Sequence, residues 1–304
     1  NSDFFTEYFP LEDLRAIDPE TGAGVFERAY ERFDVLEETT AYYVRADYYT
    51  ELFGKNFYGN FGVRYIDTTT TTQGFADING DPQWVTVDGS YTELLPSLNA
   101  NLDLNDEMIL RLSYADVLSR PGLKHLSPGI KLYSNEDSQG YAGTGQAGNP
   151  DLAPILATNL DLSFEWYYQE ASMFSAALFY KDIDSSIAYG PESVDMTFND
   201  EIYSVRQKQN IAGTKLEGVE FSLVQGLDFL PGFLKHTGVS ANYTYTQEDS
   251  NNIDAEGEPI ARRGLSEDSY NLVAFYDDNT FSVRLAYNWR SEFVRREYVL
   301  LGSG

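Results

Sequence analysis

Histidine is the first residue to consider for catalysis, and this 304-residue chain has two, His125 and His236. A Ser-His-Asp triad would need one of them as its base, but the G-x-S-x-G nucleophile elbow is absent. The 48 acidic residues offer many carboxylate pairs for glycoside hydrolysis, yet such a site depends on their separation in space. We therefore predict no catalytic residue and expect that the chain is not an enzyme.

A glycine-rich segment, residues 143–148, matches the pattern G-x-G-x-x-G of dinucleotide sites. Such a site requires a buried strand before the glycines and a helix after them, so that the pyrophosphate meets free helix N–H groups. Here Asn149-Pro150-Asp151 follows directly, and the preceding residues are polar. We expect a flexible loop and no cofactor.

Oxygen ligands cluster at Asp77, Asn79 and Asp81, and again within residues 249–258. Calcium binds such loops, but the spacing of an EF-hand is not met. Solvated acidic loops are the commoner explanation, so calcium remains a minor hypothesis and no metal site is predicted. The absence of cysteine excludes disulfides and thiolate metal sites.

Composition limits the class of protein further. The formal net charge of −27 disfavours a nucleic-acid partner, because phosphate contacts need basic residues. The chain has 19 Phe, 23 Tyr and 3 Trp, which is too aromatic for a disordered chain. A membrane helix needs about 20 consecutive apolar residues. The sequence contains no such run, so no membrane helix is predicted. A transmembrane β-barrel escapes that test, because each of its strands turns only one face to lipid.

Apolar and polar residues alternate along much of the chain, which is typical of strands with two different faces. Alternation is clearest at 158–168 and 281–290. We predict eight further strands, with an additional one around 202–211, and a short helical stretch at 24–33. The eight are 41–52, 57–68, 91–104, 108–118, 172–183, 216–224, 237–247 and 270–276.

The predicted strands have a polar, often charged second face and end in aromatic residues, as expected where a barrel wall meets lipid headgroups. The turn at 277–279 is tight, whereas long acidic, glycine-rich loops are expected at 67–91, 119–149, 184–203 and 248–269. These features predict an all-β fold, an antiparallel transmembrane β-barrel with long extracellular loops and short periplasmic turns. A soluble β-sandwich remains the alternative, because its strands alternate in the same way.

Several segments, in this order, resemble a TonB-dependent outer-membrane receptor of the type typified by Caulobacter and Xanthomonas. The similarity extends over about 200 residues. The segments are YTELLPSLN (91–99), LRLSY (110–114), SRP (119–121), GNPDLAP (148–154), TNLD (158–161), LEGVE (216–220), FLPG (229–232), NYTY (242–245) and AYNWRSEF (286–293).

The resemblance implies a location in the outer membrane of a Gram-negative bacterium, in contact with its lipid. It implies a receptor that imports a scarce, large nutrient when TonB pulls on a plug domain. We recognise neither plug nor TonB box, so residues 1–304 are expected to be part of a 22-stranded barrel. A passive porin and a soluble extracellular carbohydrate-binding protein are the alternatives.

Candidate ligand-binding residues follow from this interpretation. Charged residues on predicted inward faces can contact a polar substrate, although most such residues in barrels form lumen salt bridges. They are Arg45, Asp47, Arg64, Arg111, Asp161, Glu165, Arg284 and Arg290. Loop aromatics that could stack on sugar rings are Trp84, Tyr133, Tyr141 and Tyr189. We slightly favour an oligosaccharide over a ferric siderophore as the ligand.

Overall fold

The computed structural model describes residues 33–78, 81–134, 141–190, 193–198, 201–251 and 264–294; the side chains of residues 76–78, 81–83, 134 and 198 are not described. The predicted helical stretch at 24–33 lies outside these ranges, except for Phe33, which begins a strand. Within the described ranges, no helix is long and apolar enough to cross a membrane.

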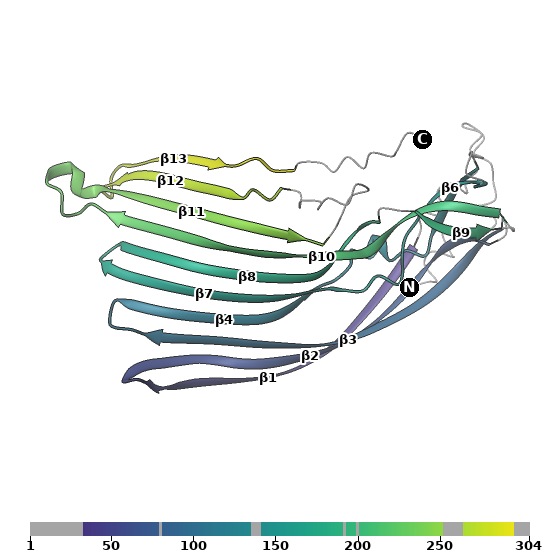
Figure 1. The fold of residues 1–304 in the computed structure, drawn as a ribbon, viewed down its shortest axis with the longest axis horizontal. Helices are drawn as coiled ribbons and strands as arrows, with labels where there is room; N and C mark the ends of the chain where they lie inside the picture. The colour runs from purple at the N-terminus through teal and green to yellow at the C-terminus, as the bar shows by residue number, and fades with distance from the viewer. Residues whose placement is uncertain are drawn as a thin grey trace.

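Thirteen strands form one sheet, and ten of them follow one another in the order β1-β2-β3-β4-β7-β8-β10-β11-β12-β13 (Figure 1). All neighbours along this path pair antiparallel. The path strands are β1 (Phe33–Leu52), β2 (Lys55–Ile78), β3 (Asp81–Asp103), β4 (Met108–Ser119), β7 (Ile155–Gln169), β8 (Ser172–Tyr189), β10 (Glu201–Gly226), β11 (Thr237–Ser250), β12 (Asp268–Asp277) and β13 (Ser282–Arg290).

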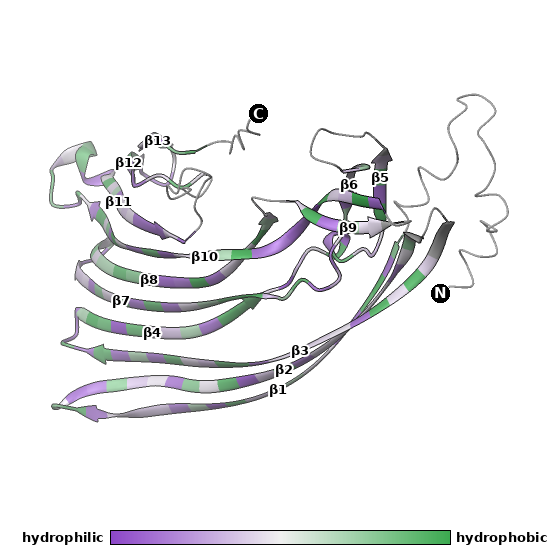
Figure 2. Ribbon diagram, turned by 45° about the vertical axis from the view of Figure 1, so that its right-hand side comes forward, coloured by the Kyte–Doolittle hydropathy of each residue, from purple (hydrophilic) through white to green (hydrophobic). Residues whose placement is uncertain are grey.

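These ten strands coincide with the ten strongest alternating segments of the sequence, so the prediction of an antiparallel sheet is confirmed. Apolar and polar residues that alternate along the sequence favour a strand, because a strand turns every second side chain to the same face. Figure 2 shows this pattern as hydrophobic and hydrophilic residues that take turns along the ribbons. The additional strand expected near 202–211 is the first half of β10.

The register separates two faces of the sheet. On the polar face, Asn60, Asn99, Ser113 and Asp161 stand in one row across β2, β3, β4 and β7. The apolar face has a matching row, displaced by one residue on each strand. It consists of Phe61, Leu98, Tyr114 and Leu160.

The apolar face carries large side chains that no second layer of described residues covers. Leu178 is 54% exposed and Leu285 is 70% exposed, although both are fully apolar. In a soluble β-sandwich these residues would pack against another sheet. Their exposure is what a lipid-facing barrel wall requires.

Connections between the path strands differ at the two ends of the sheet (Figure 1). At one end, which we call the short-turn end, brief turns join β1 to β2, β3 to β4, β7 to β8, and β12 to β13. The fifth connection there, from β10 to β11, holds the short 3-10 helix η3 (Gly232–His236). The opposite end of the sheet, which we call the loop end, has the longer connections, from β4 to β7, β8 to β10 and β11 to β12, as the sequence predicted.

One predicted loop, 67–91, is wrong. β2 and β3 run straight through it and leave only residues 79–80 between them. The threonine run 68–72 explains the difference, because β-branched residues favour strands. Each of these threonines pairs with both β1 and β3.

The described parts of two other predicted loops, 119–149 and 184–203, fold into a small structure at the loop end, whereas residues 252–263 of the predicted loop 248–269 lie outside the described residues. β5 (Ile130–Ser134), β6 (Gly143–Ala147) and β9 (Val194–Phe198) associate with the first residues of β10, and we call this unit the loop sheet. β6 runs parallel to β10, whereas the other strand pairs among the described residues are antiparallel. A 3-10 helix, η2 (Leu123–His125), precedes β5.

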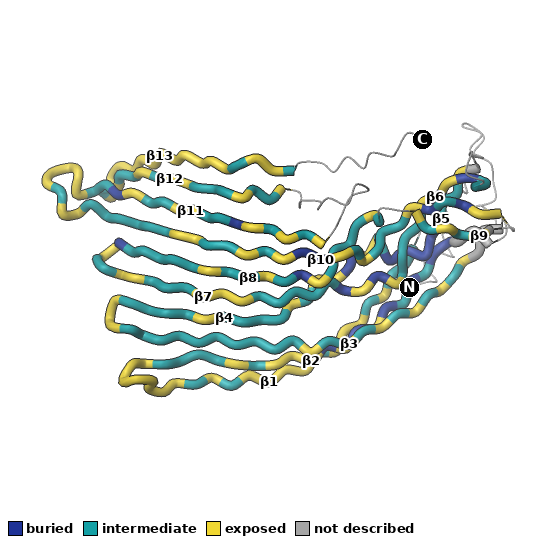
Figure 3. Tube along the Cα trace, in the orientation of Figure 1, coloured by how far each residue is buried: buried dark blue, intermediate teal, exposed yellow. Residues whose placement is uncertain are grey.

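The prediction of a flexible loop at 143–148 is therefore wrong for residues 143–147, which form β6. Glycine is needed here for close packing: a Cβ on Gly145 would lie 2.9 Å from Leu132 Cδ2 and 3.1 Å from Val205 Cγ2. Buried residues gather at this end of the molecule (Figure 3). They include Phe75, Leu126, Leu152 and Val205.

Candidate functional site

Arg111 anchors the most connected group on the polar face. Its Nε donates to Glu165 Oε1 at 2.9 Å, and its Nη1 donates to Asn101 Oδ1 at 2.8 Å. Tyr167 donates its hydroxyl to the other oxygen of Glu165 at 2.8 Å. The Glu165 side chain is 19% exposed, so the pair is partly shielded from solvent. Two of the predicted site residues, Arg111 and Glu165, are thus partners of each other.

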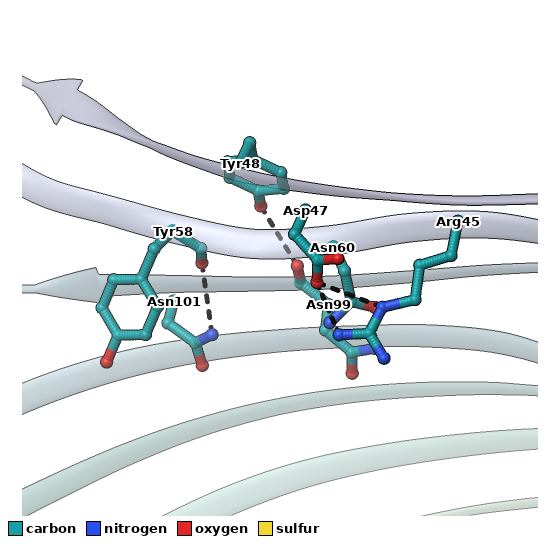
Figure 4. A network of polar contacts seen from close by, with 7 residues as sticks. All are labelled: Arg45, Asp47, Tyr48, Tyr58, Asn60, Asn99 and Asn101. Atoms are coloured by element: carbon teal, nitrogen blue, oxygen red, sulfur yellow. Dashed lines mark hydrogen bonds and ion pairs between the residues drawn. The ribbon is translucent and has the colours of Figure 1, made fainter.

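Neighbouring strands continue this polar network toward β1 (Figure 4). Asn99 donates its amide to Asn60 Oδ1 at 3.1 Å. Arg45 Nε donates to Asp47 Oδ1 at 3.1 Å, a contact within one strand that leaves both side chains more than half exposed. The polar face can therefore offer guanidinium, amide and carboxylate groups to a polar surface or solute.

Three further predicted arginines also lie on the polar face. Arg64 stands on β2 opposite Leu95 of β3 and is exposed. Arg284 and Arg290 lie on β13 and are exposed, and the guanidinium carbon of Arg290 lies 3.8 Å from the ring centre of Phe293. The register thus brings all eight predicted inward-facing charged residues, Asp47 and Asp161 included, to one face, but spreads them from β1 to β13.

The loop sheet brings basic residues of β5 and β10 together on either side of β6. Lys131 of β5 pairs with Gln146 of β6, and Gln146 pairs with Arg206 of β10. Two residues further along β10, Lys208 pairs with Tyr189 of β8. We call Lys131, Arg206 and Lys208 the cation row.

Two predicted aromatic residues contact this cation row. Tyr189 has the Arg206 guanidinium carbon 4.9 Å and Lys208 Nζ 5.8 Å from its ring centre. Lys131 Nζ lies 5.4 Å from the ring centre of Tyr133. These are cation–π distances, and both rings remain partly exposed, Tyr189 by 50% and Tyr133 by 42%.

The other two predicted aromatics are placed differently. Tyr141 donates its hydroxyl to Asp195 of β9 at 2.9 Å, which ties it to the edge of the loop sheet. Trp84 lies within β3, on the face opposite the polar one. There it packs edge-on against Phe75 with 4.9 Å between ring centres.

The calcium hypothesis falls outside what the structure describes, because the side chains of Asp77 and Asp81 and all of Asn79 are not described. Residues 252–258 of the second acidic cluster, 249–258, also lie outside the described residues. Among the side chains that are described, no group of three or more His, Asp or Glu residues is arranged to hold a metal ion.

The two histidines lie at opposite ends of the molecule. Burial, followed by the positive charges of Lys208 and Lys124, lowers the pKa of His125 below its ordinary value, so its imidazole is neutral at pH 7. His236 ends η3 at the short-turn end and meets Tyr276 edge-on at 6.0 Å. Their separate locations exclude a site that uses both.

Sequence reasoning missed the cation row and Gln146. The alternation around 202–211 indicated a strand and therefore one face for Arg206 and Lys208. Nothing in the sequence indicated that β5 and β6, about 60 to 75 residues earlier, would lie next to that face.

Comparison with known families now identifies the fold. The family model described as TonB dependent receptor-like, beta-barrel, matches residues 2–303. The chain belongs to this family. The TonB-dependent receptor barrels lie in the outer membrane of Gram-negative bacteria, so the apolar face is the lipid face, the loop end is extracellular and the short-turn end is periplasmic.

Solved structures agree with the family assignment. A mutant of the ferric enterobactin receptor PfeA from Pseudomonas aeruginosa, in complex with enterobactin, matches with a TM-score of 0.53 and 16% identity, over 84% of this chain and 42% of that chain. The siderophore receptor PirA from Acinetobacter baumannii matches with a TM-score of 0.51 and 15% identity, over 86% of this chain and 44% of that chain. The ferric-catecholate import receptor Fiu from Escherichia coli K12 matches with a TM-score of 0.51 and 16% identity, over 84% of this chain and 34% of that chain.

At these identities the likeness is one of fold. The chain spans less than half of the length of these solved receptors. Comparison with curated proteins gives no match.

Proposed function

We propose that this chain supplies part of the barrel wall and extracellular loops of a receptor that imports a scarce, large nutrient by TonB-coupled transport. The match of the family model to residues 2–303 carries this proposal. The receptor would bind its ligand at the loop end and contact TonB through a plug domain elsewhere in the protein. It would act as a transporter and not as an enzyme.

The ligand class is a separate part of the proposal. Tyr133 and Tyr189 remain partly exposed beside hydrogen-bonding groups, which suits a sugar and supports an oligosaccharide ligand. A ferric siderophore is the second candidate, favoured by the basic residues around the same rings. The similar PfeA structure holds a siderophore, enterobactin, which is a reason to test that class as well.

Uptake assays in cells test the transport mechanism. Bacteria that produce the receptor would be given labelled glycans and ferric siderophores, with and without a functional TonB. We expect accumulation of one ligand class, lost when TonB is deleted or the proton gradient is collapsed. Uptake that persists without TonB would support a passive porin instead, and no glycan uptake would overturn the oligosaccharide preference.

A further inference from the structure

The loop sheet has one buried and one exposed face. Tyr203 and Val205 of β10 and Gly145 of β6 are buried on one side. The alternate residues Gln146 and Arg206 are exposed on the other. Close packing around Gly145 fixes the strands, so the exposed face is held in shape without a ligand.

Three basic side chains share this exposed face. Lys131, Gln146 and Arg206 are register partners across β5, β6 and β10. With neighbouring strands about 4.8 Å apart, the Cα atoms of Lys131 and Arg206 are separated by about 10 Å. Both side chains are long enough to reach a single group placed above Gln146, whose amide can also donate to it.

The charge of this face is opposite to that of the chain. The chain has a formal charge of −27, yet within the part that the structure describes no carboxylate forms an ion pair with any member of the cation row. Basic side chains side by side repel each other, and a bound anion would remove that repulsion.

Aromatic rings complete the arrangement. Tyr189 lies against Arg206 and Lys208, and Tyr133 lies against Lys131. Rings in cation–π contact restrain the basic side chains, and their exposed portions offer flat surface to a neighbouring ring.

We propose that the exposed face of the loop sheet binds an acidic ligand, one that carries an oxyanion next to a ring able to pack against an aromatic side chain. The oxyanion would lie over Gln146 between Lys131 and Arg206, and the ring beside Tyr133 or Tyr189. This inference rests on the proposed receptor function and narrows its ligand class. A uronate oligosaccharide and a ferric catecholate both have this chemistry.

Binding to the purified receptor in detergent tests the inference. The probes are trigalacturonate, its fully methyl-esterified form, and ferric enterobactin, each titrated by calorimetry at low and high salt. We expect one of the two anionic probes to bind, and the neutral ester not to bind. Binding should weaken with salt, because ions screen exposed charges.

The variant Lys131→Gln/Arg206→Gln should weaken that binding by about 10- to 100-fold, the range for loss of hydrogen bonds to charged groups. The matched control is Lys55→Gln/Lys235→Gln, which removes the same charge from exposed positions at the short-turn end. It should bind as the unmodified receptor does. Migration of both variants on unheated gels verifies that each barrel is folded.

Three results would overturn the inference: no binding of either anion, equal binding of acid and ester, or equal weakening in the control variant. Which anion binds distinguishes the acidic sugar from the ferric catecholate. Failure of the transport proposal is distinguishable, because it would appear as TonB-independent uptake in cells while the anion selectivity in detergent persisted.

Discussion

At the scale of single residues, three strand glycines make room for an aromatic side chain from the neighbouring strand. In each case the glycine and the aromatic residue are direct register partners on neighbouring strands, and the aromatic side chain occupies the space that a Cβ on the glycine would need. Rings that cover strand glycines in this way protect an otherwise bare stretch of backbone. The pairs are Tyr48 with Gly59, Phe179 with Gly218, and Phe275 with Gly238.

Gly59→Ala tests this packing. A Cβ at position 59 would lie 1.9 Å from the Asn99 carbonyl oxygen and 2.7 Å from the Tyr48 hydroxyl, so β3 would have to move. We expect the free energy of unfolding in urea to fall by about 1–3 kcal/mol, as for other overpacked sites. Gly226→Ala is the control, since its nearest neighbour would be 3.7 Å away. Equal stability of the two variants would contradict the prediction.

Asp278 stabilises the periplasmic turn between β12 and β13. Its Oδ1 accepts the backbone N–H groups of Phe281 at 2.7 Å and Thr280 at 2.9 Å, and its Oδ2 accepts the Tyr276 hydroxyl at 3.0 Å. These bonds favour the ionised form, with the Phe281 N–H as the largest cause, and hold the pKa of Asp278 below its ordinary value.

This lowered pKa predicts a pH dependence for the turn. The contribution of Asp278 to stability is fully present above the unfolded pKa of about 3.9 and is lost as the pH falls through the lower folded pKa. An NMR titration of the Asp278 carboxyl should give a midpoint below that of a free aspartate. In Asp278→Asn the acid-dependent opening of the turn should disappear. A midpoint at or above the ordinary value would contradict this account.

At the scale of elements, Arg120 joins three strands at the extracellular end. It follows β4 directly, and its Nε lies 2.9 Å from the Tyr91 hydroxyl of β3 and 3.2 Å from Glu37 Oε1 of β1. Its Nη2 donates to Thr39 of β1 at 3.2 Å. One side chain thus connects strands that are far apart in the sequence.

Arg120→Met should loosen the extracellular end of β1. Loss of a part-exposed ion pair and two hydrogen bonds is expected to cost about 1 kcal/mol locally, which corresponds to about fivefold faster amide exchange at residues 33–40. Arg45→Met is the control, because Arg45 bonds to Asp47 within its own strand. Exchange that accelerates equally in both variants would indicate that Arg120 does not join the strands.

At the scale of the whole molecule, one sheet has two environments. The polar face carries the charged network and the apolar face carries exposed leucines and aromatics. Because side chains alternate, residues next to each other in the sequence belong to different environments. The same substitution at neighbouring positions should therefore destabilise the barrel at one position and be tolerated at the other.

Leu178→Arg and Ala177→Arg form such a matched pair. Leu178 faces lipid, where an arginine near the centre of the bilayer costs about 2–4 kcal/mol. Ala177 lies on the polar face, opposite Ser163 and Glu220, where an arginine is hydrated and near a carboxylate. Refolding into lipid vesicles, measured as gel migration without heating, should fail or weaken for Leu178→Arg alone. The reverse result would mean that the two faces are assigned wrongly.

The sequence by itself determined the strands of the barrel and their faces. Alternation along segments such as 158–168 is a local property of the chain, so β7 and its two faces were predictable. The same reasoning assigned Arg111, Glu165 and the other inward charges to one face. It failed at 67–91, where polar, threonine-rich composition indicated a loop although the strands continue.

Only the tertiary structure decided which of these residues meet. Arg111 and Glu165 are 54 positions apart, and their pairing depends on the register of β4 with β7. Lys131 and Arg206 share a surface because β6 inserts between β5 and β10. Short strands such as β6 carry too few residues for a periodic signal, and contacts across a sheet are set by long-range pairing. Local sequence therefore fixed the barrel strands, whereas the loop sheet and its cation row arose from packing.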